Sequence, residues 1–490
     1  MLESGRPSWK VALIPFAFLV AIIVCVVSFF GADALAGGSQ VALLLASAAV
    51  VAISMRFYKV PWACFEESIS NNIKTVSSAI LILLLIGGIS GTWMVSGVVP
   101  TLICYGLKII TPKLFLFAAC VICAVVSIMT GSSWTTIATI GIALIGIGTA
   151  QGYSAGWIAG AIISGAYFGD KVSPLSDTTV LASSSSETPL FVHIRYMLYT
   201  TVPSIAIALL VFLVVSLTHH SDTAVDVAQI EAVLRGTFVI SPWLLVVPLL
   251  TGILIVKKVP AMITLSSAIF FAVVASLIAQ PHIIQQIADP AAAGSHLSFR
   301  VAFTGVMVSI YDATSIQTGN EMLDSLVATR GMNGMLSTIF LIICAVTFGG
   351  VLSGSGMMES LTQAITNHVK GRTGMVGATV FTGLLSNMVV GDQYLSIILT
   401  SNLYKHSYRS RGLESRLLSR SVEDSATITS VLVPWNSCGM TQATVLRVAT
   451  LEYLPYCIFN YLSPLISIFV AAIGYKIIRI KPSADGNQAV

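Results

Sequence analysis

The chain has 490 residues, of which 56% are hydrophobic and 9% are charged, and its mean hydropathy is +0.90. This composition excludes an ordinary soluble domain and is typical of a bundle of membrane-spanning helices. The net charge of +4 is too small to indicate a nucleic-acid partner. The hydropathy makes the lipid bilayer the expected surrounding of the chain.

Ten apolar windows, taken in chain order, are long enough to cross a bilayer. They lie near residues 11–30, 39–55, 76–97, 155–183, 196–217, 240–256, 260–279, 335–353, 421–445 and 456–475. Arg6 and Lys10 precede the first window, which is longer than the apolar region of a signal peptide and is interpreted as a retained helix. Two further apolar stretches, 113–150 and 374–402, have polar middles and predict re-entrant hairpins. The predicted fold class is an all-α polytopic membrane protein.

Basic residues flank the second hairpin on both sides, which predicts that it enters and leaves from the cytoplasm. These residues are Lys370, Arg372, Lys405, Arg409, Arg411, Arg416 and Arg420. Basic residues near both termini predict that both ends of the chain are also cytoplasmic, whereas the loop with Asp222 and Asp226 falls outside. Lys108 and Lys113 are the exceptions, because this threading places them on the outer side.

The window 155–183 contains the motif GDKVSPLSDTT at residues 169–179. Pro174 cannot donate a helix hydrogen bond and disfavours helical geometry at the residue before it, so a break is predicted there. Irregular backbone at membrane depth survives only where protein or a water-filled cavity covers it. A second broken helix is predicted at 421–445, where Pro434 follows an acidic pair.

These features predict an inverted-repeat ion-transporter fold, with a first repeat at 1–238 and a second at 239–490. Each half would contain spans, an amphipathic arm (62–75 and roughly 299–330), a glycine-interrupted span, a hairpin, a broken helix and a closing span. Gly87 and Gly88 would mark the interrupted span of the first half, and Gly349 and Gly350 that of the second. Paired interrupted helices in inverted repeats indicate a secondary transporter with its site at the midplane.

A sodium site needs about five or six oxygen ligands, and these sequences supply hydroxyls, amides and carboxylates near the predicted breaks and tips. The predicted ligands are Ser132, Ser133 and Thr135; Asp170, Ser173, Ser176, Asp177 and Thr178; Asn387 and Asp392; and Asp424, Thr427, Asn436 and Ser437. Burial raises the pKa of a carboxyl group and a nearby cation lowers it, so Na⁺ and H⁺ can compete for one site. Lys171 is either a partner of the site or a structural counter-charge for one carboxylate.

Other chemistries have little support. The sequence has no HExxH motif and no Walker loop, which argues against a metalloprotease and an ATP-driven pump. The serine run 183–186 lacks the Gly-x-Ser-x-Gly setting of a hydrolase. We therefore expect a transporter rather than an enzyme, with no cofactor; a channel would not need two mirrored clusters of carboxylates.

Four stretches carry a resemblance to the NhaC family of sodium/proton antiporters. They are the motif at 169–179, Thr130-Gly-Ser-Ser-Trp134, Gly391-Asp-Gln-Tyr394 and Pro434-Trp-Asn-Ser-Cys-Gly439. Val180 and Ser437 depart from the family pattern, which often has Asn and Thr there. The resemblance implies exchange of Na⁺ for H⁺ at the cytoplasmic (inner) membrane of a prokaryote, with a homodimer as one arrangement. One branch of the family implies the alternative, a sodium-coupled transporter of an organic solute such as malate/lactate or an amino acid, where Lys171 or Arg447 would face the anion.

Overall fold

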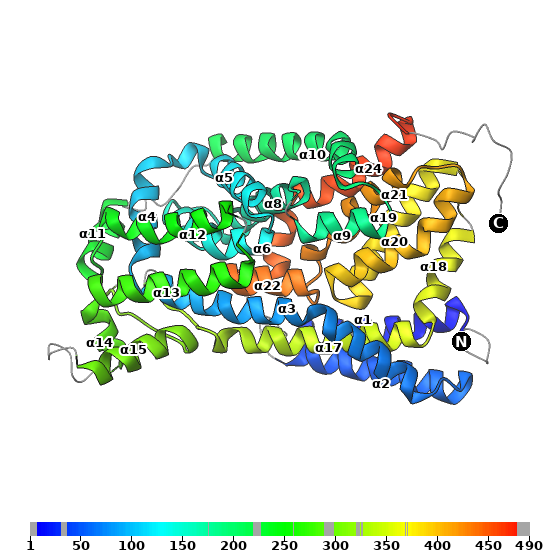
Figure 1. Ribbon diagram of the computed structural model, residues 1–490, viewed down its shortest axis with the longest axis horizontal. Helices are drawn as coiled ribbons and strands as arrows, with labels where there is room; N and C mark the ends of the chain where they lie inside the picture. The colour runs from blue at the N-terminus through cyan, green and yellow to red at the C-terminus, as the bar shows by residue number, and fades with distance from the viewer. Residues whose placement is uncertain are drawn as a thin grey trace.

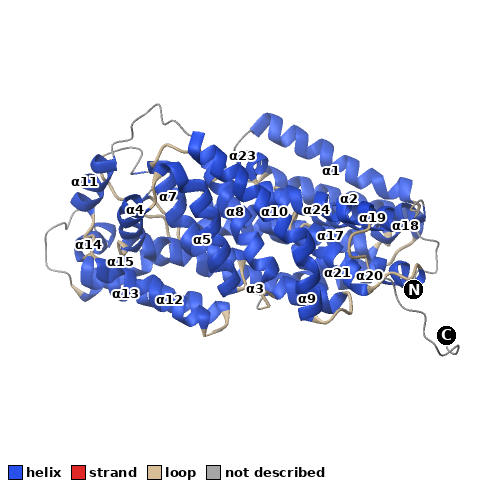
Figure 2. Ribbon diagram, turned by 90° about the horizontal axis from the view of Figure 1, so that it is seen from above, coloured by secondary structure: helices blue, strands red, loops and turns tan. Residues whose placement is uncertain are grey.

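A computed structural model describes residues 7–30, 37–174, 176–218, 227–257, 259–288, 298–319, 324, 327–367, 369 and 371–477. Several residues used above to assign sidedness lie outside the described residues: Arg6, Asp222, Asp226 and Lys370. The described part is helical, and Figure 2 shows helices joined by loops. The fold class predicted from the sequence is therefore confirmed.

The first half of the chain forms eleven α-helices among the described residues. They are α1 (Trp9–Phe30), α2 (Gly38–Tyr58), α3 (Trp62–Val95), α4 (Val98–Ile109), α5 (Phe115–Thr130), α6 (Ser133–Thr136), α7 (Ile142–Ala150), α8 (Ala155–Val172), α9 (Asp177–Ser185), α10 (Leu190–Thr218) and α11 (Val227–Thr237). A π-helical segment, Ile137–Gly141, joins α6 to α7, and a 3₁₀ turn, Pro112–Leu114, precedes α5.

The second half continues with further helices and short 3₁₀ turns. The α-helices are α12 (Val246–Val256), α13 (Ala261–Ala279), α14 (Pro281–Ala288), α15 (Phe299–Tyr311), α17 (Leu336–Gly354), α18 (Met357–Asn367), α19 (Gly371–Val390), α20 (Gln393–Ser410), α21 (Ser415–Val422), α22 (Ser437–Leu446), α23 (Thr450–Tyr453) and α24 (Ile458–Ile473). A π-helical segment, Glu423–Thr427, extends α21, and the 3₁₀ turns are Pro242–Leu245, Asn333–Met335, Ser430–Leu432 and Leu454–Tyr456.

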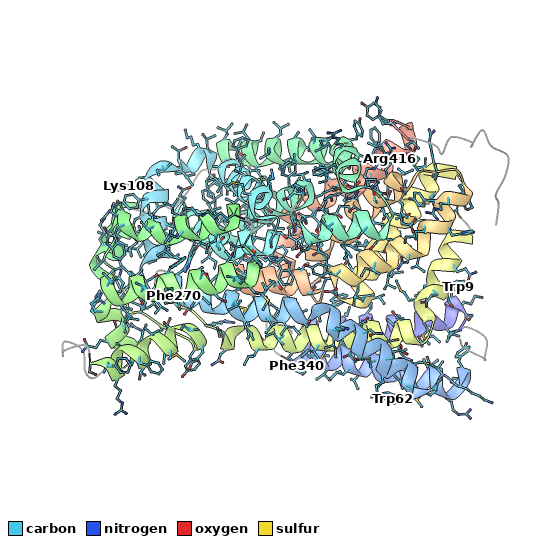
Figure 3. All side chains as sticks on the ribbon, in the orientation of Figure 1. Trp9, Trp62, Lys108, Phe270, Phe340 and Arg416 are labelled. Carbon is cyan, nitrogen blue, oxygen red and sulfur yellow. The ribbon has the colours of Figure 1, made fainter. Side chains whose placement is uncertain are left out.

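Eight helices of the described residues are long and apolar enough to cross a membrane, or up to eleven if each bent pair counts as one span. The long helices α3, α10, α13 and α17 run along the horizontal axis of Figure 1. Figure 3 places Trp9, Trp62 and Arg416 toward one end and Lys108 at the other. The predicted sidedness, with both termini in the cytoplasm, stays a prediction.

The structure corrects two details of the predicted repeat. The arm at 62–75 is not separate from the following span, because α3 is one helix of 34 residues. The glycines of α3 and α17 also do not interrupt their helices. They let other segments approach closely instead: a Cβ on Gly87 would lie 2.5 Å from the Gly331 carbonyl oxygen, and one on Gly350 would lie 2.9 Å from Ile69 Cα. The repeat boundaries themselves stay a prediction.

Helices α5 and α8 pack against each other through two glycines of α8. A Cβ on Gly165 would lie 2.1 Å from the carbonyl oxygen of Cys120, and one on Gly169 would lie 2.4 Å from that of Ala124. Small residues at helix interfaces allow close backbone approach inside a membrane. Because Gly169 precedes Asp170, this packing holds that carboxylate beside the C-terminal end of α5.

Candidate functional site

The first hairpin meets the first broken helix at its tip. Helix α5 ends at Thr130, and the φ of 66° at the following Gly131 lies in the left-handed region that glycine favours. Ser132 then caps α6 by accepting a hydrogen bond from Thr135 N at 3.2 Å. The next residue, Ser133, donates to Asp170 Oδ2 from its backbone N–H at 3.1 Å and from its hydroxyl at 2.7 Å. The predicted break at Pro174 is confirmed, since α8 ends at Val172 and α9 begins at Asp177.

The second hairpin meets the second broken helix in the same manner. Helix α19 ends at Val390, the following Gly391 has φ of 69°, and Asp392 caps α20 by accepting a hydrogen bond from Leu395 N at 3.0 Å. The Ser437 hydroxyl donates to Asp392 Oδ2 at 3.0 Å, and Ser437 N donates to the Gly391 carbonyl at 2.8 Å. The break at Pro434 is confirmed, because the backbone leaves the helix after Leu432 and α22 begins at Ser437.

Side-chain amides reinforce the second contact. Asn436 caps α22 by accepting from Cys438 N at 3.0 Å, and its Nδ2 donates to the Asn387 carbonyl at 3.1 Å. Asn387 in turn donates from Nδ2 to the Ala426 carbonyl at 2.7 Å. Asn387, Asp392, Asn436 and Ser437 are all buried. The predicted residues of the second hairpin and the second break therefore come together in one network.

The remaining predicted ligands of the first half lie around the break. Ser176 caps α9 and its hydroxyl lies 2.9 Å from that of Thr178, while the Ser173 hydroxyl donates to the Ile128 carbonyl at 2.8 Å. Ser176 also interacts with the Asp170 carboxylate. Asp177, at the start of α9, is exposed, and so is Val180. The oxygens nearest to Asp170 are thus the hydroxyls of Ser133 and Ser176.

The two tips lie near each other. Tyr394, two residues after Asp392, is close enough to Asp170, Asp177 and Asp392 for a Coulomb interaction with each. In Figure 1, α6 and α22 lie near the middle of the molecule, whereas α19 and α20 occupy one half of the long axis. Each limb of the first hairpin is long enough to count as a span by itself, so re-entry is inferred from the central position of its tip rather than from length.

A buried ion pair joins the two halves beside this site. Lys171 Nζ donates to Asp424 Oδ1 and also to the Ser463 hydroxyl at 2.8 Å, and both charged side chains have no exposed surface. Thr200 and Ser463 donate to the same Asp424 oxygen at 3.1 and 3.0 Å. Sequence reasoning missed Thr200 and Ser463, because single hydroxyls inside long apolar windows give no pattern. Of the two roles open for Lys171, this pairing supports that of counter-charge to a carboxylate.

The structure corrects the position of Arg420, which sequence reasoning placed among the cytoplasmic basic residues. Arg420 lies in the last turn of α21 and has no exposed surface. Its guanidinium lies over the ring of Tyr196 at 4.8 Å, and its Nε is 3.9 Å from Asp424 Oδ2. The spacing of four residues between Arg420 and Asp424 puts them on one helical face. This spacing could have indicated the pair in the sequence, but Arg420 was counted with the basic residues of the preceding loop instead.

The last predicted ligand, Thr427, contributes its backbone. Its carbonyl accepts from Gln393 Nε2 at 2.9 Å and from the Ser430 hydroxyl at 2.7 Å, while no described residue hydrogen-bonds to its hydroxyl. Thr427 therefore helps hold the second hairpin tip against the second broken helix.

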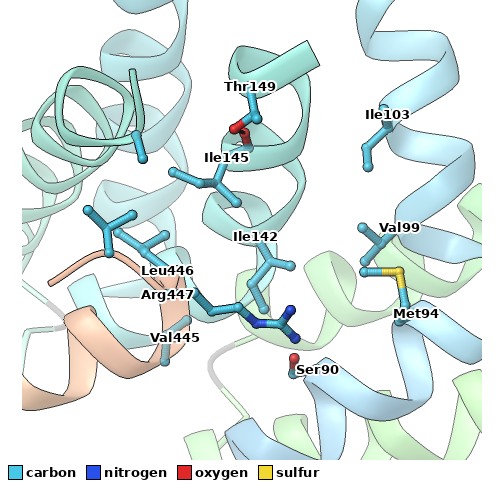
Figure 4. A pocket seen from close by; sticks show the side chains of 12 residues that line it. Ser90, Met94, Val99, Ile103, Ile142, Ile145, Thr149, Val445, Leu446 and Arg447 are labelled. Atoms are coloured by element: carbon cyan, nitrogen blue, oxygen red, sulfur yellow. Dashed lines mark hydrogen bonds between the residues drawn. The ribbon is translucent and has the colours of Figure 1, made fainter. Parts of the chain in front are cut away.

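A separate pocket lies at the other end of α22. It has a volume of about 800 Å³ including the part open to solvent, and Arg447, at the C-terminal cap of α22, points into it (Figure 4). Most of its lining is apolar, with the hydroxyls of Ser90 and Thr149 as polar groups. Helix α22 has ten residues and is about 15 Å long, so the pocket and the Asp392–Ser437 contact lie at opposite ends of one short helix.

Comparison with known proteins identifies relatives over most of the chain. The sequence model of the Na⁺/H⁺ antiporter family matches residues 165–475. The Na⁺/H⁺ antiporter NhaC of Alkalihalophilus pseudofirmus is 36% identical over 87% of this chain and 88% of its own length, and that of Bacillus subtilis is 33% identical over 87% and 91%. A malate-2H⁺/Na⁺-lactate antiporter of Bacillus subtilis is 35% identical over 81% of each chain.

Proposed function

We infer that this chain, which belongs to the Na⁺/H⁺ antiporter family, is a secondary transporter that exchanges Na⁺ for H⁺ across the membrane. The family predicted from four short motifs is confirmed by relatives that share about a third of their residues with this chain. As in its relatives, the proposed activity is transport and not the chemical conversion of a substrate.

One observation carries the proposed Na⁺ site: the carboxylate of Asp170 lies where the first hairpin tip meets the break in the α8–α9 helix. Asp170 is 6% exposed, and the hydroxyls of Ser133 and Ser176 surround it. Carboxylate and hydroxyl oxygens suit a hard monovalent cation, and unwound helix segments supply such ligands in secondary transporters. The exposed Asp177, seven residues along, adds negative charge on the approach to Asp170.

Asp424 does not belong to the Na⁺ ligands in this proposal. Its Oδ1 already accepts from three donors: the Lys171 ammonium and the hydroxyls of Thr200 and Ser463. An ion pair in the membrane interior is stable only when its geometry and hydrogen bonds compensate for desolvation, and removing one partner would strand a charge. Lys171 and Asp424 therefore form a structural ion pair that joins the two halves of the chain.

The second tip fits a structural role better than a second Na⁺ site. Both oxygens of Asp392 accept hydrogen bonds, from Leu395 N and from Ser437 Oγ, and the side chain has no exposed surface. An ion entering there would have to displace a helix cap. We therefore assign Asp392, Asn387, Asn436 and Ser437 to holding the second hairpin against α22.

The ion gradients supply the driving force, so we propose no cofactor. We also propose the cytoplasmic membrane of a prokaryote as its place, with both termini in the cytoplasm, and a homodimer as one arrangement to test by cross-linking in membranes.

The deciding experiment uses the full chain in proteoliposomes with a trapped pH dye. Addition of Na⁺ to the outside, with no organic solute present, is expected to move protons in the opposite direction. Absence of a pH change under an inward Na⁺ gradient would contradict the proposed exchange. Proton movement that appears only after malate, lactate or an amino acid is added would instead assign the chain to organic-solute exchange.

The pocket at Arg447 favours that second activity. A guanidinium in a pocket whose lining residues are mostly apolar can hold a carboxylate by paired hydrogen bonds while the apolar walls accept a short carbon chain. If a small organic anion is carried, an Arg447→Gln variant would lose its uptake while the Na⁺-driven pH change stays within about twofold of wild type.

A further inference from the structure

Glu423 is a buried acid that the proposed Na⁺ site does not use. It begins the π-helical segment Glu423–Thr427 and has no exposed surface. Neither of its carboxylate oxygens has a partner in hydrogen-bond geometry among the described residues, and the hydroxyl that interacts with the carboxylate is that of Thr427, four residues later. Burial of an ionised carboxylate without hydrogen bonds is among the most costly arrangements in a protein, and binding a proton removes that cost.

The side chains around Glu423 come from several elements. His193 of α10 presents Nε2 at 4.0 Å from Glu423 Oε2, and its Nδ1 lies 2.8 Å from the Ser419 hydroxyl. The charged groups that act on Glu423 are Lys171 and Asp170 of α8 and the neighbouring Asp424. Arg420, one turn earlier on the same helical face, is the remaining buried charge.

The charges around Glu423 allow its carboxyl group to be either ionised or protonated. Lys171 pairs with one oxygen of Asp424, and Arg420 Nε lies 3.9 Å from the other oxygen, so two cations face Asp424 and Glu423 is the second acid beside them. No nitrogen of the Arg420 guanidinium has a hydrogen-bond partner among the described residues. Lys171, Asp424, Arg420 and Glu423 together are neutral with Glu423 ionised and carry one positive charge with Glu423 protonated; Asp170, on the other side of Lys171, adds one negative charge. Ionised Glu423 gains from the charge of Lys171 and loses from burial, so the same group can both bind and release a proton.

The cluster is distinct from the Na⁺ position but adjacent to it. Asp170 and Lys171 are consecutive residues at the end of α8: the first contacts the hairpin tip at Ser133, and the second contacts Asp424 beside Glu423. Na⁺ at Asp170 would cancel a negative charge that acts on Glu423. That cancellation favours the ionised form of Glu423 and so favours release of its proton.

On this basis, and resting on the proposed Na⁺/H⁺ exchange, we propose that Glu423 carries the exchanged proton at a site separate from the Na⁺ position, with His193 as its positioning residue. When Glu423 takes up the proton, an O–H bond of hydronium breaks and the O–H bond of the carboxyl group forms; release reverses both changes. The proton comes from water on one side of the membrane and leaves to water on the other. Competition of both ions for Asp170 alone is the arrangement that this proposal replaces.

The test is the Glu423→Gln variant, because glutamine has the shape of a protonated glutamate but cannot release a proton. Two fluxes are measured in proteoliposomes: exchange of radioactive Na⁺ for unlabelled Na⁺, and Na⁺-driven proton movement. We expect Na⁺/Na⁺ exchange within about twofold of wild type and proton movement reduced at least about tenfold. The matched control is Glu414→Gln, at the surface before the same helix, where Glu414 pairs with Arg416 at 2.5 Å; both fluxes should stay unchanged.

Proton movement in Glu423→Gln within twofold of wild type would overturn the proposal, because Glu423 would then be a permanently neutral residue. If both fluxes are lost, Na⁺-dependent thermal stabilisation of the purified variant decides. Stabilisation that persists and no longer depends on pH supports the proposal, and its loss assigns Glu423 to Na⁺ binding or folding and overturns it. Wild-type protein without any Na⁺/H⁺ exchange would instead refute the proposed function itself.

His193→Gln gives a separate readout for the positioning role. It should shift the pH at which proton movement is half-maximal by about one unit while the maximal rate changes little, because the imidazole faces the carboxyl group without carrying the proton. An unchanged pH profile would remove His193 from the proposed site.

Discussion

The two tip-and-break contacts have the same backbone and opposite chemistry. In each, a left-handed glycine ends one helix, the next residue caps the following helix, and a proline break lies opposite. In the first contact the carboxylate is Asp170 on the broken helix and the tip offers the serine; in the second the carboxylate is Asp392 on the tip and the broken helix offers the serine.

This exchange of positions separates two functions. Asp170 is slightly exposed and lies near a second carboxylate, Asp177, which gives an incoming cation both access and attraction. Asp392 is fully buried, and its two carboxylate oxygens accept hydrogen bonds from Leu395 N at the helix cap and from the Ser437 hydroxyl. In the proposed function, the same backbone arrangement therefore provides one Na⁺ site at Asp170 and one structural contact at Asp392.

The largest expected contrast is between Asp170→Asn and Asp392→Asn. Loss of the buried Asp170 charge at the first contact should reduce Na⁺/H⁺ exchange by roughly 100-fold or more, because a buried site without its counter-charge no longer holds a cation. Asparagine is itself a good helix cap, so Asp392→Asn should keep exchange within about fivefold of wild type. The measurement is Na⁺-driven proton movement in proteoliposomes, with insertion checked by size-exclusion chromatography. Equal losses in the two variants would show that both contacts carry ions.

A smaller contrast is expected between Ser133→Ala and Ser437→Ala. Ser133→Ala removes one hydroxyl from Asp170 and should raise the apparent KM for Na⁺ about tenfold, which corresponds to one charge-assisted hydrogen bond. Ser437→Ala should leave that KM within about twofold and lower the free energy of unfolding by about 1 kcal/mol. KM is measured from initial rates over a series of Na⁺ concentrations, and stability from thermal unfolding in detergent. A raised KM in Ser437→Ala would bring the second contact into Na⁺ binding.

The smallest effect is expected far from both contacts, at Glu187 in the loop between α9 and α10. The hydrogen bond from Lys405 and the charge of Arg409 hold the pKa of Glu187 below its usual value. A lowered folded-state pKa means that the stabilisation is present at neutral pH and is lost as pH falls through that lowered pKa. Glu187→Gln should therefore lower Tm slightly at pH 7, have no effect at strongly acidic pH, and leave exchange unchanged. A defect in exchange would show that this surface tie takes part in transport.

Sequence patterns predicted the parts of the site that depend on backbone chemistry. Pro174 and Pro434 each force a break, and the hydroxyl- and acid-rich tips at Ser132 and Asp392 were found because such residues are rare inside apolar windows. The glycines of α3 and α17 led to a wrong prediction of interrupted helices, because a glycine in a membrane helix allows close packing as readily as it allows a break. A glycine needed for a positive φ and a glycine needed for close approach of another segment cannot be told apart in the sequence.

The partners of buried charges could not be predicted. Lys171 and Asp424 are 253 residues apart, and only the folded chain brings them together. Arg420 follows a run of surface arginines, so charge counting assigned it to the same loop. Its true environment depends on where α21 begins, and helix boundaries are the least reliable part of a reading from one sequence.

The proposed exchange requires alternation between two open forms, and the glycine contacts between α5 and α8 limit how these helices can move in it. With carbonyl oxygens of α5 lying where a Cβ of α8 would stand, these helices cannot slide past each other without a clash. We expect them to travel as a rigid body that carries Asp170 and the Ser133 tip together. The hinges of the cycle then fall at the unwound segments after Val172 and Leu432, so the ion stays with its ligands while the surrounding bundle tilts around it.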